Sequence, residues 1–283
     1  MTLSILTAKL LIIPQKSIVI ITLMLLTFVG TSQAQHLQLS TRSDSCVHYY
    51  YEGWRQVMDQ GNYTASAVAF RKMASFDSGF WIGQALLGRI SENLEEQETI
   101  LENIEQHKRN VTGDERLLLD IFTELLKLTI LRQKDPSRAT EQLKKALQIG
   151  EENFRTVVHK YPGEVYYKSE YIEVLNYNHG AQVALDSLYA LTSKQQKKQP
   201  FLLGFAAHLE AELGNIDNAK EKARMLEKVM ADQKAPKPYV VWADVLYAAG
   251  EYDKAMECLE KGLEIDPGNL DAIRLKSKLE SKN

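Results

Sequence analysis

The residues best spaced for chemistry are His208 and Glu212, which lie one helical turn apart. A zinc protease would need a second histidine at that spacing, and a structural zinc site would need clustered cysteines and histidines. Neither pattern is present, because the cysteines Cys46 and Cys258 are far apart in the chain. We therefore predict no bound metal, no cofactor, and structural or surface roles for the histidines.

Other catalytic signatures are also missing from the sequence. The chain has no GxGxxG motif, no phosphate-binding loop and no GxSxG elbow. The acidic pairs at 95–96 and 151–152 stand in charged helical surroundings, which is typical of solvated helix faces. One group leaves a catalytic or ligand-binding alternative open, namely Tyr166, Tyr167, Tyr171, Tyr177 and His179.

The composition predicts which elements must position these side chains. Of 283 residues, 45% are hydrophobic and 25% are charged, which is typical of a packed globular chain. Leu, Ala, Glu and Lys dominate after the N-terminal region, so the expected fold class is all-α. The formal net charge is −3, and the one dense basic run, 194–198, is better explained as a solvated loop. We expect no nucleic-acid partner.

Residues 1–34 have the order of a signal peptide. Lys9 and Lys16 precede the uncharged apolar run 17–29, and small residues lead to Ala34, where we predict cleavage. An uncleaved anchor is the alternative, since residues 10–29 nearly span a bilayer, although a proline and a lysine interrupt them. The Ser-Gln-Ala-Gln ending is similar to that of Gram-negative exported proteins, so the predicted location is the periplasm or cell surface.

An internal repeat is clearest near the C-terminus. Residues 236–269 read as two helices joined at Gly250 and ended by Pro267. Glycine turns the chain without a Cβ penalty, and proline cannot continue the helical hydrogen-bond ladder. One unit upstream, Ala219 follows the turn residue Gly214 and stands 36 positions before Ala255. The pattern therefore predicts a series of helix hairpins.

This spacing resembles the tetratricopeptide repeat, whose pattern combines small residues, a turn glycine, a tyrosine and a closing proline. The three strongest units carry it at Gly61, Tyr63, Gly214, Ala219, Trp242, Ala243, Gly250, Tyr252, Ala255 and Pro267. Two weaker units contribute Ala139 and Ala184. The resemblance implies a right-handed superhelical solenoid of about five to six antiparallel helix hairpins plus a C-terminal capping helix. In it the alanines let helices approach closely, and Tyr252 fills the gap beside them.

The resemblance covers most of residues 45–283. We assign residues 1–34 to a signal peptide and 35–44 to a short linker. The three strong repeats are 45–78, 200–233 and 236–269. The divergent middle is 80–199, and the capping helix is 270–281. In an open linear array, Cys46 and Cys258 would lie at opposite ends. No disulfide between them is therefore predicted.

The resemblance also implies a partner site, because the first helix of each hairpin lines a concave groove that receives extended peptides or partner helices. The matching positions here are Tyr51, Arg55, Phe201, Phe205, His208, Val240, Asp244 and Tyr247. The alternative role for each aromatic residue is packing between adjacent first helices. The Lys and Asn clamp that binds acidic chaperone tails is absent from these positions.

The expected function is a non-catalytic protein-interaction scaffold of the bacterial cell envelope that binds a peptide or partner protein. One alternative is an envelope enzyme or small-ligand-binding protein with its site in the divergent middle. Another is a membrane-anchored sensor subunit, which would contact the membrane through residues 1–34 if they stay uncleaved.

The export hypothesis predicts that mature protein from the native host begins at Gln35. The peptidase requires small residues one and three positions before the cut, and Ala34 and Ser32 meet that requirement. Intact-mass measurement of the purified protein checks this. Recovery of a chain that retains residues 1–34 in the membrane fraction would instead support the anchor.

Overall fold

The computed structural model describes residues 36–281, so the predicted signal peptide and the first linker residue lie outside the described part. In that part the chain forms thirteen α-helices and no β-strand. None of the described helices is long and apolar enough to cross a bilayer.

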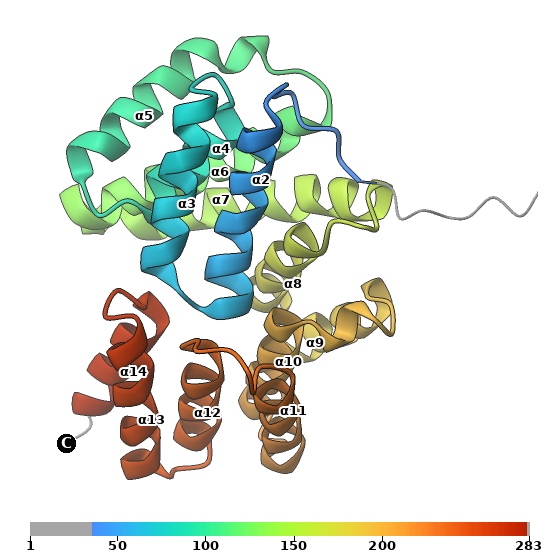
Figure 1. Cartoon of the computed structure of the whole chain (residues 1–283), viewed down its shortest axis with the longest axis vertical. Helices are drawn as coiled ribbons and strands as arrows, with labels where there is room; N and C mark the ends of the chain where they lie inside the picture. Colours follow the sequence, from blue (N-terminus) through green and yellow to red (C-terminus); the bar gives the residue numbers. More distant parts are fainter. Residues whose placement is uncertain (1–35, 282–283) are drawn as a thin grey trace, which may run out of the picture. The chain divides into compact units, whose positions relative to one another are not determined.

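The helices follow one another with short connections (Figure 1). The first seven α-helices are α2 (Asp44–Trp54), α3 (Tyr63–Phe76), α4 (Trp81–Ile90), α5 (Leu94–His107), α6 (Asp114–Lys134), α7 (Pro136–Lys160) and α8 (Val165–His179). The remaining six are α9 (Ala181–Leu191), α10 (Pro200–Glu212), α11 (Ile216–Val229), α12 (Lys237–Ala248), α13 (Tyr252–Ile265) and α14 (Leu270–Glu280). A π-helix, η1 (Arg55–Gln60), extends α2, and two short 3₁₀ turns are η2 (Lys108–Asn110) and η3 (Gln196–Lys198).

Neighbouring helices pack in pairs. Six antiparallel hairpins, α2–α3, α4–α5, α6–α7, α8–α9, α10–α11 and α12–α13, are followed by α14 packed on α13. This confirms the all-α solenoid of about six hairpins with a terminal capping helix. The divergent middle also follows the hairpin plan, with a long second helix in α7.

Local sequence explains where the helices start and turn. Asn62, Asn93 and Asn269 each accept a hydrogen bond from a backbone N–H of the first turn, at 2.8–3.0 Å. Such caps satisfy donors that the helix itself leaves unpaired. Gly214 and Gly250 have left-handed φ values of 78° and 77°, which allow a tight turn inside a hairpin.

The small residues of the repeat pattern lie mostly where helices meet. Ala184, Ala219 and Ala255 are fully buried, each on the second helix of its hairpin. Ala139 is only half-buried, and Ala146 is the fully enclosed alanine of α7.

Tyr252, expected to fill the gap beside the close helix contact, is more exposed than that role implies. Its side chain is 41% exposed, and its ring lies 5.5 Å from that of Tyr247. Tyr252 is the first residue of α13, so its ring meets that of Tyr247 of α12 at the turn end of the hairpin.

The hydrophobic core is continuous from the first hairpin to the last helix. Four clusters of buried side chains lie within residues 37–175, 172–209, 203–245 and 240–279. Consecutive clusters share helices, so each hairpin is held by the next, as in a solenoid. Hydrogen bonds also join the first helices of successive hairpins. His208 pairs with Asp244 at 2.7 Å and Asn176 donates to Glu212 at 3.0 Å, each across 36 positions.

The first hairpin also contacts the last one. The carboxylate of Asp266, which is 1% exposed, accepts hydrogen bonds from Tyr63 N and Thr64 Oγ1, both at 2.6 Å. The side chain of Asn269, equally buried, donates from Nδ2 to Gly61 O at 2.6 Å. We call these contacts between residues 61–64 and 266–269 the clasp. In Figure 1 they lie where the lower end of α3 approaches α14.

The clasp corrects the expectation of an open array with separate ends. The loop at 266–269 would ordinarily link one repeat to the next, but here Asp266 also caps the N-terminus of α3. Cys46 is buried in the first core cluster, and Cys258 is half-buried against the last one.

The clasp can be tested by cross-linking its two sides. A Cβ built on Gly268 would lie 2.9 Å from Thr64 Oγ1, close to the roughly 3 Å that a disulfide needs between one sulfur and the opposite Cβ. Thr64→Cys with Gly268→Cys should therefore oxidise readily and raise the free energy of unfolding by about 2 to 4 kcal/mol. Cys46 and Cys258 are first replaced by alanine. Thiol titration and denaturant unfolding measure the two effects.

The matched control keeps Thr64→Cys and moves the second cysteine to the exposed position Ser277 of α14. That pair should stay reduced. If the Thr64 and Gly268 cysteines also stay reduced under the same oxidant, the two ends are not in contact.

Overpacking tests the close approach of α12 and α13. Ala255→Leu adds methylenes at a fully buried contact, and such overpacking typically costs about 1 to 3 kcal/mol. The same change at Ala248, which is exposed on α12, should alter the free energy of unfolding by less than about 0.5 kcal/mol. Equal melting temperatures for the two variants would contradict the assigned packing.

Candidate functional site

The inner surface of the first four hairpins is filled by the protein's own aromatic side chains. Helix α2 packs directly on α8, where the ring of Trp54 stacks on that of Tyr166 with centroids 5.8 Å apart. Behind it, the hydroxyls of Tyr50 and Tyr167 share a hydrogen bond, and both residues are fully buried. Burying large rings contributes strongly to stability. The concave groove expected along the first hairpins is therefore closed to a partner.

The two predicted groove residues in this half have local partners. Tyr51 donates from its hydroxyl to Glu164 Oε1 at 3.3 Å. Arg55 forms a bidentate pair with Glu52, at 2.8 and 2.7 Å, on an exposed surface. The structure does not bring Tyr51 into contact with the predicted groove residues of α10 and α12.

A different arrangement occurs on α10 and α12. Phe201, Phe205 and His208 follow one another at helical spacing, with ring centroids 5.8 and 5.9 Å apart, and the last two rings are nearly parallel. His208 Nδ1 then reaches Asp244 Oδ2 on the neighbouring first helix. We call Phe205, His208, Glu212, Asp244 and Tyr247 the inner strip. They are half-buried or exposed, so their side chains remain accessible.

The surroundings of His208 favour its protonated form. Burial alone would lower the pKa of this imidazole, but the hydrogen bond and charge of Asp244, with the charge of Glu212, outweigh burial and raise it. Glu212 Oε2 lies 3.5 Å from His208 Nε2. Both ring nitrogens thus face carboxylates, which favour the protonated form of the imidazole.

Two other predicted groove residues, Phe201 and Val240, pack against neighbouring parts of the protein. Phe201 lies beneath Lys237, whose Nζ is 4.7 Å from the ring centroid, and its backbone N–H donates to Asp59 Oδ1 at 3.2 Å. Val240 is buried in the last core cluster and would contact a Cβ added at Gly262 of α13. The groove role assigned to Val240 is therefore corrected, because its side chain packs inside its own hairpin.

Tyr247 has both structural and accessible surface. Its ring packs partly against the last core cluster, and Lys278 Nζ lies 4.6 Å from the ring centroid. Because Tyr247 is only half-buried, part of the ring remains open to contact.

One acidic residue near the inner strip, Glu173, could not be identified from the sequence. Glu173 is exposed to solvent, yet protein surrounds it closely enough that desolvation, with the charges of Glu170 and Asp271, raises its pKa to about 7. Arg89 and His208 act in the opposite direction. These groups come from α4, α8, α10 and α14, so no local sequence pattern could reveal them.

The tyrosines of the divergent middle do not form one site. Tyr167 and Tyr171 are buried in the core, whereas Tyr177 is exposed. Tyr166 donates to Asp59 Oδ2 at 2.8 Å, and His179 Nε2 lies 2.9 Å from Glu151 Oε1. The structure thus disperses the residues that supported a catalytic centre in this region.

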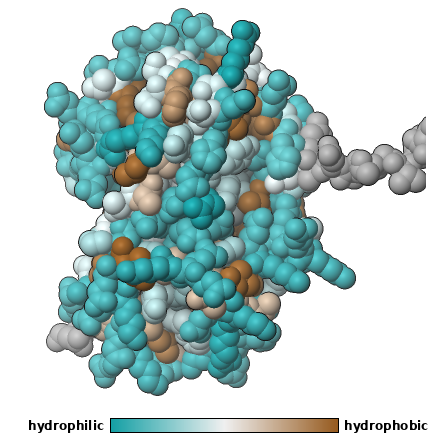
Figure 2. All heavy atoms as spheres, in the orientation of Figure 1, coloured by the Kyte–Doolittle hydropathy of each residue, from teal (hydrophilic) through white to brown (hydrophobic). Residues whose placement is uncertain are grey.

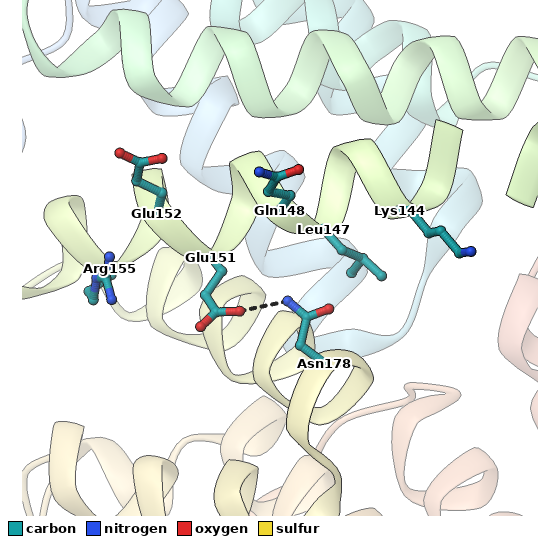
Figure 3. Close-up of a pocket in the computed structure, with 7 residues that line it drawn as sticks. All are labelled: Lys144, Leu147, Gln148, Glu151, Glu152, Arg155 and Asn178. Atoms are coloured by element: carbon teal, nitrogen blue, oxygen red, sulfur yellow. Dashed lines mark hydrogen bonds between the residues drawn. The ribbon is translucent and has the colours of Figure 1, made fainter. Parts of the chain in front are cut away.

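A shallow depression of about 430 Å³ lies between α7 and α8 (Figure 3). Its lining is Lys144, Leu147, Gln148, Glu151, Glu152 and Arg155 of α7 with Asn178 of α8. Asn178 donates to Glu151 Oε2 at 2.7 Å, and the remaining polar groups point in several directions. Ligand pockets are usually concave and mostly apolar with a few convergent polar groups, which this surface is not. Among residues 36–281, no group of three or more His, Cys, Asp or Glu side chains could hold a metal ion.

Comparison with known families bears on the last hairpin. Residues 236–269, which contain α12, α13 and the clasp loop, match the family model described as Tetratricopeptide repeat. The chain is a tetratricopeptide-like solenoid. Such repeats generally mediate protein interactions, and the inner strip belongs to the matched unit and the one before it. No curated protein matches this chain.

Proposed function

We propose that this chain is a non-catalytic scaffold of the bacterial cell envelope, which holds a protein or peptide partner against the inner strip. The observation that carries the proposal is the accessible row of Phe205, His208 and Asp244, which joins two successive first helices. Rigid rings bury much area at small entropy cost, and charged neighbours give orientation. The envelope location rests on the predicted signal peptide.

The surface properties support a localised contact. Figure 2 shows hydrophilic residues over most of the displayed face, with apolar residues in small separate areas. The displayed face therefore lacks the broad hydrophobic surface that is typical of many obligate oligomer interfaces. A partner anchored by a few aromatic and charged groups agrees better with the inner strip.

The proposal predicts that removing the two strip rings weakens partner binding more than it weakens the fold. Phe205→Leu with Tyr247→Leu retains apolar volume toward the core, so the free energy of unfolding should fall by less than about 1.5 kcal/mol per site. Loss of such anchors should reduce affinity about thirtyfold, or about 2 kcal/mol. The partner is captured from envelope fractions by the native chain, identified by mass spectrometry, purified and titrated.

The matched control is Tyr189→Leu with Tyr239→Leu, which removes two exposed rings outside the strip. It should bind the partner with native affinity. Native affinity in the strip variant, or an equal loss in both variants, would contradict the proposed site.

A further inference from the structure

An extended segment of the chain itself lies on the surface of the helices. Residues 36–41 precede α2 and have no helical structure, and their side chains alternate in exposure. Leu37 is buried in the first core cluster, and Leu39 packs partly against it, whereas His36, Gln38 and Ser40 are exposed. This is the period of an extended peptide with one face on a protein surface. Figure 1 shows the segment (blue) running from beside the α7–α8 connection to the start of α2.

Two buried carboxylates hold the main chain of this segment. Glu164, 3% exposed, accepts hydrogen bonds from Leu37 N at 3.0 Å and lies 3.1 Å from His36 Nδ1. Glu115, 6% exposed, accepts from Ser40 N at 2.6 Å. Backbone N–H groups are common to every extended peptide, so these contacts recognise a peptide by its conformation.

A third polar contact completes the site. Thr41 Oγ1 donates to Asp77 Oδ2 at 2.6 Å, just before the chain enters α2. Three acids, from the start of α6, the turn after α3 and the residue before α8, therefore follow the peptide along its length. The side-chain pocket for Leu37 gives the selectivity that main-chain contacts lack.

Of the two carboxylates, Glu115 takes its hydrogen bond from the segment, whereas Glu164 also accepts one from Tyr51. Within the part of the chain that the structure describes, Ser40 is the one donor to Glu115, and burial raises the pKa of Glu115 while this hydrogen bond lowers it. Removing the segment would deprive Glu115 of this donor and expose the apolar surface that Leu37 covers, which is costly. This surface is therefore more stable with a peptide bound to it, although residues 36–41 contribute only one buried side chain, that of Leu37. Segments with so few buried contacts open more readily than the hairpin cores.

We propose that the surface formed by the start of α6, the turn after α3 and the residue before α8 is a peptide-binding site, which residues 36–41 fill in cis and a partner's extended segment fills in trans. The partner segment has a basic residue at the position of His36 and an aliphatic residue at the position of Leu37. Three residues after the aliphatic one, at the position of Ser40, it has a backbone N–H that can donate to Glu115. This site is separate from the inner strip, and the inference does not depend on the function proposed for the strip.

The test weakens the cis segment and offers the same peptide in trans. The protein comprises residues 35–283, which contain every described core cluster, and the probe is a fluorescein-labelled synthetic peptide with the sequence of residues 35–42. Leu37→Ser should bind the probe, measured by fluorescence anisotropy. The native chain should bind it at least about tenfold more weakly, because its tethered segment competes at about millimolar effective concentration.

Matched changes locate the binding. Gln38→Ser alters an exposed neighbour in the same segment and should behave as the native chain does. Adding Glu115→Leu to Leu37→Ser should weaken the probe about tenfold, as loss of a charge-assisted hydrogen bond predicts. A probe with serine in place of its leucine should not bind. Failure of a folded Leu37→Ser protein to bind the native probe overturns the proposal, and so does equal binding by the native chain.

A second measurement needs no variant and so remains decisive if Leu37→Ser fails to fold. Excess unlabelled peptide should accelerate amide hydrogen exchange at Leu37 and Ser40 of the native chain, because the cis segment is displaced. Unchanged exchange at those two amides overturns the proposal. A native dimer that exchanges its segments, detected by sedimentation, would overturn the choice of partner, since the occupant would then be a second copy.

Discussion

The packing of α2 against α8 is the contact on which the remaining architecture depends. Trp54 and Tyr50 meet Tyr166 and Tyr167 across the interior, so the first helix of the first hairpin touches that of the fourth. An ordinary repeat array contacts only its nearest neighbours. Here the aromatic contact fixes the position of the first hairpin, and that position brings η1 and the following turn to α10 and the clasp loop.

Filling the interior in one half explains why accessible inner surface is found in the other. Side chains of α2, α4, α6 and α8 share one core cluster, and a groove lined by those helices has no room for a partner. On α10 and α12 the corresponding residues face each other through the His208–Asp244 pair, and their outer surfaces stay accessible. The same repeat therefore serves two purposes, core formation early in the chain and display later.

Much of the fold could be predicted from sequence because its signals are local. Gly250 turns one hairpin, Ala255 lies at a helix contact, and their spacing recurs upstream, so hairpins and their order are readable from short windows. The clasp could not be predicted from the sequence, because Asp266 and Asn269 lie in a segment typical of any loop between repeats. Their role depends on residues about 200 positions away. Val240 was misassigned for a related reason, because helical spacing alone does not say which way a helix is rotated in its hairpin.

The clasp also has a consequence for how this protein can be engineered and how it reaches its native state. Repeat arrays are commonly shortened or extended by whole units, because stability is nearly a sum of neighbouring terms. This chain should lack that modularity, since deleting the last unit also removes the carboxylate that caps the second helix of the first unit. Contacts of such long sequence separation form late and slow the folding of a chain. The first hairpin is therefore complete only after the last loop has been made, which couples the first and last hairpins into one cooperative unit.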